Sequence, residues 1–134
     1  MDQTRKLIPL LATAASLLMA VALVIGAAAA PDPFKGKWHS TDVDGSYQTL
    51  QIGGGPGSSY HVRYFDDGAT VCGADMLTAA SANGWLTASG DTLSGNIQLY
   101  CLFSPPTPYE SGSYFEYTLV GGNLVDQWDT VWTH

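Results

Sequence analysis

The sequence predicts an all-β fold: an antiparallel up-and-down meander of seven to eight strands in a closed or nearly closed small barrel, preceded by an N-terminal signal helix. Three observations support this prediction. Short runs rich in Tyr, Trp, Val, Ile and Thr alternate with clusters of Gly, Asp, Asn, Ser and Pro, a spacing typical of a small barrel or sandwich. Most of the connections are short, so consecutive strands are expected to pair. A long uncharged apolar run precedes the first strand.

The start of the chain is typical of an export signal. Arg5 and Lys6 precede an uncharged apolar run over residues 7–30, which ends in four alanines. A basic start, an apolar stretch and a small-residue Ala-x-Ala end are the features that a signal peptidase reads. We therefore expect residues 1–29 to be a signal peptide and residues 30–134 to form one secreted or periplasmic domain. The apolar run is also long enough to span a bilayer, so an uncleaved N-terminal anchor is the alternative.

Seven segments of the domain are expected to be strands, because each is rich in β-branched and aromatic residues between turn residues. They are 37–42, 46–52, 59–65, 77–88, 92–103, 113–120 and 124–133. A short eighth strand over residues 69–72 would bring the count to the even number that closes an antiparallel barrel. Residues 104–111 contain three prolines and are expected to be a surface connection that cannot continue a ladder.

The two cysteines, Cys72 and Cys101, are predicted to form a disulfide, because exported proteins fold in an oxidising compartment. If the hairpin between the two longest strands pairs Ala88 with Asp91, Cys101 lies across from Thr78, within easy reach of Cys72. The bridge would close a 29-residue separation and stabilise the fold by about 3–4 kcal/mol on the chain-entropy model. Two free thiols are the alternative.

The residues Gly36-Lys37-Trp38 resemble the Gly-x-Trp that opens lipocalins and, in similar form, avidin-like barrels. Those families are small exported up-and-down barrels of eight strands whose interior holds one small ligand. The resemblance implies a barrel of the shorter, avidin-like size, and it carries none of those families' ligand-contacting residues over to this chain. The chain also resembles small secreted proteins of bacteria.

The charge of the predicted domain excludes two classes of partner. Eleven carboxylates stand against three cationic side chains, Lys35, Lys37 and Arg63, which gives a net charge of −8. Nucleic acid is excluded, because phosphate binding needs a basic surface. An anionic membrane surface would repel the domain, so no membrane partner is expected after signal cleavage. A strongly acidic surface is typical of a soluble extracellular protein.

Catalytic signals are missing from the sequence. The domain has three histidines, His39, His61 and His134, and the first two alternate with apolar neighbours and are therefore expected on the solvated face. A Ser-His-Asp site needs a histidine as its base, and neither a Gly-x-Ser-x-Gly elbow nor a glycine-rich loop before a helix occurs. Glu116 and Asp126 are the carboxylates that alternate with aromatic residues. We predict no enzyme and no cofactor.

Asp42 and Asp44 are the residues that a calcium site would use, since they place carboxylates at alternate positions before Gly45. A complete calcium loop needs further oxygen ligands and a bidentate glutamate at its end, and neither follows here. A plain Asp-Gly hairpin explains the same letters. The sequence therefore predicts no metal site.

The aromatic content points to the candidate ligand-binding residues. The last predicted strand places Trp128 and Trp132 on one face with Asp126, and Trp38 on the first strand is expected beside Trp132 at the seam where a barrel closes. Aromatic rings mixed with hydroxyls and a carboxylate suit a pocket for a small amphipathic or sugar-like ligand. The candidates are Trp38, Tyr64, Asp126, Trp128 and Trp132. The alternative is that the tryptophans simply fill the core.

Two functions are therefore predicted as alternatives. The first is a secreted, non-enzymatic binding module for a small amphipathic or sugar-like ligand. The second is a structural or protein-interaction domain of the cell envelope, with a solid and ligand-free barrel whose exposed tyrosines between Tyr109 and Tyr117 meet another protein. The expected partners are accordingly a small molecule or an extracellular protein. The sequence carries no signal for an oligomeric state.

Overall fold

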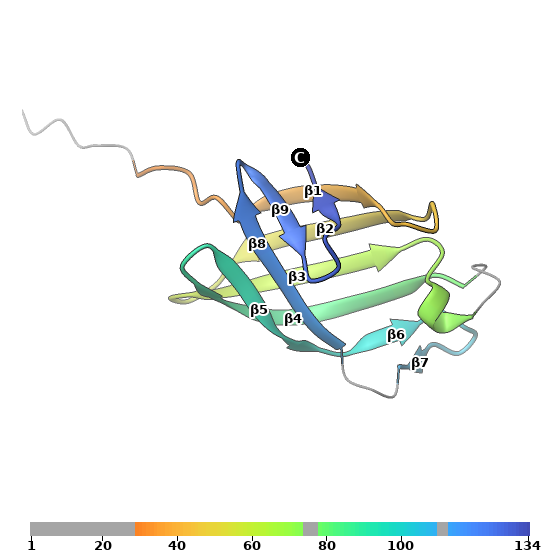
Figure 1. The fold of residues 1–134 in the computed structure, drawn as a ribbon. Coiled ribbons are helices and arrows are strands. Elements are labelled where there is room, and N and C mark those ends of the chain that lie inside the picture. Colours follow the sequence, from red (N-terminus) through yellow and green to blue (C-terminus); the bar gives the residue numbers. More distant parts are fainter. Residues whose placement is uncertain (1–28, 74–77, 110–112) are drawn as a thin grey trace, which may run out of the picture. The chain divides into compact units, whose positions relative to one another are not determined.

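Antiparallel strands dominate the computed structural model, which describes residues 29–73, 78–109 and 113–134 (Figure 1). The strands are β1 (Gly36–Thr41), β2 (Tyr47–Gly54), β3 (Ser59–Asp66), β4 (Ala80–Ser89), β5 (Thr92–Ile97), β6 (Leu99–Cys101), β7 (Thr107–Pro108), β8 (Ser113–Val120), β9 (Asn123–Asp126) and β10 (Val131–Trp132), with one 3-10 helix, η1 (Thr70–Cys72). No helix within these described ranges is long and apolar enough to cross a membrane. The predicted signal peptide, except for Ala29, lies outside the described residues.

Eight of the strands follow one another around a barrel. Their order is β1-β2-β3-β4-β5-β8-β9-β10, and every neighbouring pair is antiparallel. The first and last strands meet at a backbone bridge, where His39 N–H donates to Thr133 O at 2.8 Å and Thr133 N–H donates to His39 O at 3.0 Å. The predicted all-β, nearly closed meander is thus confirmed. β6 pairs with β4 and with β7, off the path around the barrel.

The barrel interior is built by the alternation of the strands. The largest fully buried side chains are Trp38, Trp132, Tyr117, Leu50, Leu86, Leu93, Leu124 and Val62. Inward and outward positions alternate because successive side chains of a strand point to opposite faces. Trp38 and Trp132 directly precede the bridged residues His39 and Thr133, so both tryptophans lie at the seam, as the sequence predicts.

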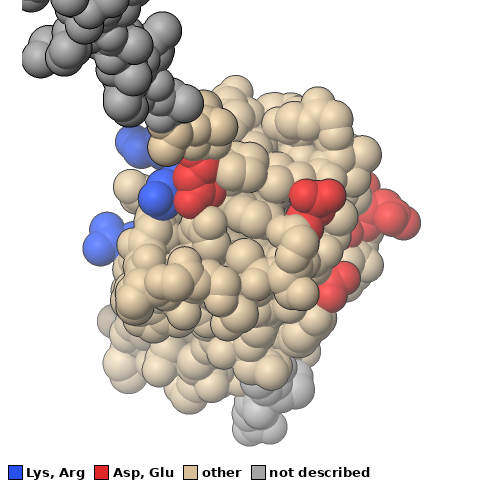
Figure 2. All heavy atoms as spheres, turned by 90° about the vertical axis from the view of Figure 1, so that its left-hand side faces the viewer, with Lys and Arg blue, Asp and Glu red and all other residues tan. Residues whose placement is uncertain are grey.

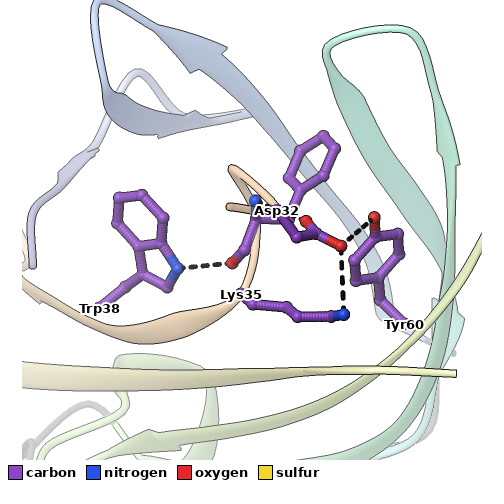
Figure 3. Close-up of polar contacts among 5 residues, drawn as sticks. Asp32, Lys35, Trp38 and Tyr60 are labelled. Carbon is purple, nitrogen blue, oxygen red and sulfur yellow. Dashed lines mark hydrogen bonds and ion pairs between the residues drawn. The ribbon is translucent and has the colours of Figure 1, made fainter. Parts of the chain in front are cut away.

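One end of the barrel is covered by the segment that leads into β1 (Figure 3). Phe34 in this segment is buried and packs edge-on against Tyr60 with ring centroids 5.4 Å apart. Its backbone carbonyl accepts the indole N–H of Trp38 at 2.9 Å, while the Tyr60 hydroxyl donates to Asp32 at 2.8 Å and Lys35 lies 3.5 Å from the same carboxylate. These contacts fasten the segment over this end, which we call the closed end.

The last predicted strand is wrong in one respect, because residues 124–133 form two strands rather than one. β9 and β10 pair antiparallel with each other, Val125 opposite Val131, across a turn. One oxygen of Asp126 accepts the backbone N–H groups of Trp128 and Thr130, both at 2.9 Å, which satisfies the turn backbone locally. β10 is therefore the eighth strand of the barrel, whereas the proposed strand at 69–72 contains the helix η1 instead.

The disulfide between Cys72 and Cys101 is confirmed, with the Cα atoms 5.4 Å apart. The expected register is shifted by two residues, since Ser89 pairs with Thr92 and Cys101 lies opposite Ala80 rather than Thr78. The hairpin turns tightly because Gly90 takes φ 60°, a left-handed conformation that glycine adopts without strain.

The predicted surface connection at 104–111 also contains a short strand that the sequence did not indicate. Thr107 pairs with Cys101 and Pro108 with Tyr100, which makes β7. A proline is tolerated here because β7 pairs on one side only, so its missing N–H costs no ladder hydrogen bond.

Candidate functional site

The end of the barrel opposite the closed end holds a cavity of about 600 Å³, which we call the open-end cavity. In an up-and-down meander alternate strands end and begin at the same rim. The ends of β3 and β9 bring Asp66 and Asp126 to this rim, and the beginnings of β2 and β4 bring Gln48 and Ala80. The volume falls in the range of small-molecule sites.

The wall of the cavity is mostly apolar and aromatic. Its apolar and aromatic lining residues are Val43, Tyr64, Ala69, Val71, Ala80, Leu99, Tyr109, Tyr114, Phe115 and Trp128. Four of them are exposed at its mouth: Val43 at 99%, Trp128 at 69%, Val71 at 52% and Tyr114 at 47% of their surface. A wall of this kind removes hydrocarbon from water, which is the main driving force for binding an apolar group.

The interior next to the cavity is filled by aromatic side chains. Tyr64 contacts Phe115 edge-on with ring centroids 5.4 Å apart, and its centroid lies 6.2 Å from that of Trp132. Trp132 in turn packs perpendicular to Tyr117 at 5.7 Å. The barrel therefore combines a packed aromatic core with a cavity at its open end, features of both predicted alternatives.

Four polar side chains meet at the cavity wall, and we call them the Gln48 cluster: Asp42, Gln48, Tyr64 and Asp66. The amide nitrogen of Gln48 lies 3.2 Å from Asp42 Oδ2, 3.1 Å from the Tyr64 hydroxyl and 3.2 Å from Asp66 Oδ2. Tyr64 donates to the same oxygen of Asp66 at 3.2 Å. Burial and the charge of Asp66 raise the pKa of Tyr64, so its hydroxyl keeps its proton and acts as a donor.

Asp126 lies in the cavity wall as a separate polar group. Its carboxylate is 8% exposed, and Oδ2 accepts the indole N–H of Trp132 at 3.1 Å. Tyr117 lies opposite Asp126 in the β8–β9 pair, and burial together with the Asp126 charge raises the pKa of Tyr117. Asp126 thus joins the turn after β9 to the aromatic core.

Of the five predicted ligand-binding residues, the structure brings Tyr64, Asp126 and Trp128 to the cavity. Trp38 and Trp132 lie in the core, with 0% and 1% of their surface exposed, and are not among the lining residues. The predicted shared face of residues 126–132 is wrong, because the turn after Asp126 carries Trp128 outward while Trp132 returns to the core.

Three important lining residues were missed: Gln48, Asp66 and Phe115. Two of them could have been found from the alternation of inward and outward positions along a strand. Gln48 shares the inward face of its strand with Leu50, and Asp66 shares that of its strand with Tyr64. A polar residue at an inward position close to a strand end is a recognisable sign of a polar group at a barrel mouth.

The disulfide shapes one side of the cavity. Cys72 ends η1, whose Thr70 and Val71 line the cavity, and Cys101 ends β6, whose Leu99 lines it as well. The bridge therefore fixes the short helix against the sheet at the mouth. A disulfide in this position is typical of a protein that folds in an extracellular or periplasmic compartment.

Ordinary structural partners are found for Asp42, Asp44, His39 and Glu116, of which Asp42 also lines the cavity. Asp42 Oδ1 and Asp44 Oδ1 accept backbone N–H groups of the β1–β2 turn, and no group of three or more His, Cys, Asp or Glu within the described ranges is arranged to hold a metal ion. The Tyr47 hydroxyl lies 2.6 Å from Nδ1 of His39, and Glu116 accepts the hydroxyl of Tyr114 at 2.7 Å.

The other two histidines contact tryptophans. His61 packs edge-on against Trp85, and His134 lies over Trp38 with ring centroids 3.6 Å apart. All three histidines lie outside the set of residues that line the cavity.

The tyrosines of the 109–117 region differ in exposure. Tyr114 is exposed, whereas Tyr117 is buried, so the expectation of an exposed tyrosine surface is wrong for Tyr117.

The cationic side chains of the described residues are Lys35, Lys37 and Arg63, and none of them lines the cavity. Lys37 and Arg63 both lie opposite Gln51, on neighbouring sides of β2. Figure 2, which views the closed end, shows Lys and Arg side chains at one edge and acidic side chains beside them and at the opposite edge. The positive charge of the described residues therefore lies outside the cavity wall.

The fold and the cavity define the class of this protein as a small antiparallel β-barrel with one closed and one open end. No family model, curated protein or solved structure matches the chain.

Proposed function

We propose that this protein is a secreted, non-enzymatic binding module that takes one small amphipathic ligand into the open-end cavity. The observation that carries the proposal is a cavity of about 600 Å³ whose apolar and aromatic wall surrounds a few convergent polar groups, the Gln48 cluster. An apolar wall binds the body of a ligand, and a small set of polar groups orients it. The disulfide is consistent with a place outside the cytoplasm.

The exposed aromatic and aliphatic rim supports the same function. Val43 and Trp128 are the two most exposed large apolar side chains among the described residues, and both line the cavity. Exposed apolar side chains cost solubility, and where they gather around a concave site they mark a binding surface. A ligand that fills the cavity would cover part of this surface.

A structural or protein-interaction domain is the second candidate. Three side chains on and after β6 are exposed: Tyr100, Leu102 and Phe103, at 42%, 39% and 46% of their surface. They belong to a segment that lies off the path around the barrel. A partner protein that covers them would use the outer wall rather than the cavity. In this case the cavity is not expected to bind a small apolar probe.

A neutral fluorescent probe tests the proposal. N-phenyl-1-naphthylamine carries no charge and emits more strongly in apolar surroundings, so titration of the mature protein is expected to give saturable binding of one molecule per chain. Thr70 lies in the mouth and is exposed, so Thr70→Trp should weaken probe binding by about tenfold or more, equivalent to about 1.4 kcal/mol. The matched control is Thr87→Trp, an exposed position on β4 away from the cavity.

Two results would argue against the binding module. The probe could fail to bind, or it could bind equally to wild type, Thr70→Trp and Thr87→Trp. The first result favours the structural role, and the second places the probe elsewhere on the surface. Native mass spectrometry of the protein recovered from its own medium supplies the stoichiometry and reports any ligand that is already bound.

A further inference from the structure

The charged side chains that line the open-end cavity all carry negative charge. They are Asp42, Asp66 and Asp126, and among the residues that the structure describes no Lys, Arg or His lines the cavity with them. Within the described part of the chain a single ion pair is present, between Lys35 and Asp32 at the closed end. The three cavity carboxylates thus have no cationic side chain to compensate their charge, although buried charges in proteins are usually paired.

Asp66 is the clearest case. It is 3% exposed, lies in the cavity wall and has hydrogen-bond donors around it but no cation. A buried carboxylate of this kind is stabilised further by a positive charge that enters the cavity, because the Coulomb attraction is stronger away from bulk water. The cavity therefore favours a cation over an anion or a neutral group of the same size.

The Gln48 cluster also has fewer donor hydrogens than acceptors. The amide nitrogen of Gln48 approaches three oxygens, those of Asp42, Tyr64 and Asp66, but it carries only two hydrogens. The Tyr64 hydroxyl adds one hydrogen, which it directs to Asp66. The backbone N–H groups of Val43 and Gly68 donate to the other oxygens of Asp42 and Asp66, so each carboxylate oxygen has at least one donor. A carboxylate can accept about four hydrogen bonds, so lone pairs remain for the N–H groups of a ligand.

Asp126 plays a different part. Its oxygens already accept the backbone N–H groups of Trp128 and Thr130 and the indole N–H of Trp132. It contributes negative potential to the cavity. Asp42 and Asp66 each lie 3.2 Å from the same amide nitrogen of Gln48, which makes them the carboxylate pair that a cation in the cavity would meet.

The rest of the wall suits an organic cation. Aromatic rings such as those of Tyr64, Tyr114 and Trp128 attract a cation over their faces, and Leu99 and Phe115 offer apolar surface for a hydrocarbon body. A bare metal ion is a poor fit, because no group of three or more ligating side chains is found among the residues described.

We infer that the open-end cavity selects amphipathic organic cations, with a primary ammonium group at Asp42 and Asp66 and a hydrocarbon chain along the apolar wall. This inference rests on the proposed function, since it names the class of ligand for the same cavity.

The experiment compares three compounds that share one tail and differ in the charge of the head group. Octylammonium, octyl glucoside and octyl sulfate, each below its micelle concentration, compete with N-phenyl-1-naphthylamine for the mature protein. Octylammonium is expected to displace the probe at a concentration about tenfold or more below that of octyl glucoside, and octyl sulfate is expected to be the weakest. Asp66→Asn keeps the shape of the side chain and removes its charge, so it should reduce the preference for octylammonium over octyl glucoside.

Asp42→Asn is the second variant, because Asp42 is only partly buried and its replacement puts less strain on the fold. It is expected to reduce the preference for octylammonium in the same direction. Asp91→Asn is the matched control, since it changes the net charge equally at an exposed position in the β4–β5 turn, and it should leave the preference unchanged.

The outcomes separate this inference from the proposed function. If the probe binds but the three compounds displace it equally, the cavity binds amphipathic ligands without selecting cations and the inference is wrong. The same conclusion follows if Asp91→Asn reduces the preference as much as Asp42→Asn does, because net charge alone then explains it. If the probe does not bind at all, the proposed function itself fails.

Discussion

The indole N–H of Trp132 donates a hydrogen bond of 3.1 Å to Oδ2 of Asp126, across the hairpin that ends the chain. Both residues are buried. Because the other oxygen of Asp126 accepts two backbone N–H groups of the turn, a single carboxylate holds both the turn and the closing strand. Thr133, directly after Trp132, makes the backbone bridge to His39, so this contact holds the strand that closes the barrel.

Replacement of Asp126 by Asn is expected to destabilise the protein. The amide oxygen of Asn can still accept the backbone N–H groups of the turn, but its NH₂ group then faces the indole N–H of Trp132, and two donors oppose each other. A hydrogen bond to a charged group contributes about 1.5–3 kcal/mol, and we expect a loss of this size in the free energy of unfolding, measured in urea. In a Trp132→Phe background, which lacks the donor, the same replacement should cost less; equal costs in both backgrounds would contradict the contact.

Asp126 also explains where the sequence succeeds and where it fails. The strands from β1 to β4 and β8 were predictable, because apolar residues recur at alternate positions and turn residues bound each strand. The predicted strand 92–103 is wrong in its length, since it divides after Ile97 into β5 and β6. The break between β9 and β10 was not, since Asp, Gln and Thr within 124–133 are compatible with an outward-facing strand position. The turn depends on side-chain-to-backbone hydrogen bonds from Asp126, and alternation of residue types does not reveal them.

The candidate site was predictable only in part for the same reason. Tyr64 and Trp128 belong to the cavity as expected, but an unbroken last strand assigned Trp128 and Trp132 to one face. The predicted strand 59–65 stops one residue before Asp66, whereas Asp66 ends β3 on its inward face. The error lies in the strand boundary, because a shift of one residue moves a side chain between the core and the solvent.

Trp128 and Trp132 offer a direct test of the division between rim and core. Trp128→Ala removes a side chain that is 69% exposed, so the free energy of unfolding should change by no more than about 0.5 kcal/mol. Trp132→Ala removes a fully buried side chain and should cost about 3–5 kcal/mol. Urea unfolding measures both.

Probe binding tests the role of Trp128 in the cavity separately from its role in stability. If Trp128 covers the cavity mouth, Trp128→Ala should weaken binding of N-phenyl-1-naphthylamine in a protein of wild-type stability. Unchanged probe affinity in this variant would remove Trp128 from the proposed site.

The disulfide is expected to contribute to stability through the chain that it closes. Cys72 and Cys101 are separated by 29 residues, which corresponds to about 3–4 kcal/mol on the chain-entropy model. The double variant Cys72→Ala with Cys101→Ala should lose this amount in urea unfolding. The bridge holds η1 at the cavity mouth. The folded variant, measured without denaturant, should therefore also bind the neutral probe more weakly than wild type does. A double variant as stable as wild type would show that the disulfide does not stabilise the fold.

The contact network at the closed end makes stability depend on pH through Asp32. Burial raises the pKa of this carboxyl, but hydrogen bonds from Tyr60, the Phe34 backbone and Lys35 outweigh it and hold the pKa below its ordinary value of 3.8. Because the folded-state pKa is lowered, Asp32 stabilises the protein fully above the unfolded-state pKa of about 3.8. This stabilisation is lost as the pH falls through the folded-state pKa. The free-energy difference between wild type and Asp32→Asn should thus be constant between about pH 5 and pH 7 and shrink below about pH 4. A difference that persists unchanged at about pH 2 would show that the carboxylate charge does not hold this segment in place.

Tyr60→Phe is a second test of the same contact. It removes the hydroxyl that donates to Asp32, so the Asp32 carboxyl should titrate closer to 3.8 in this variant than in wild type.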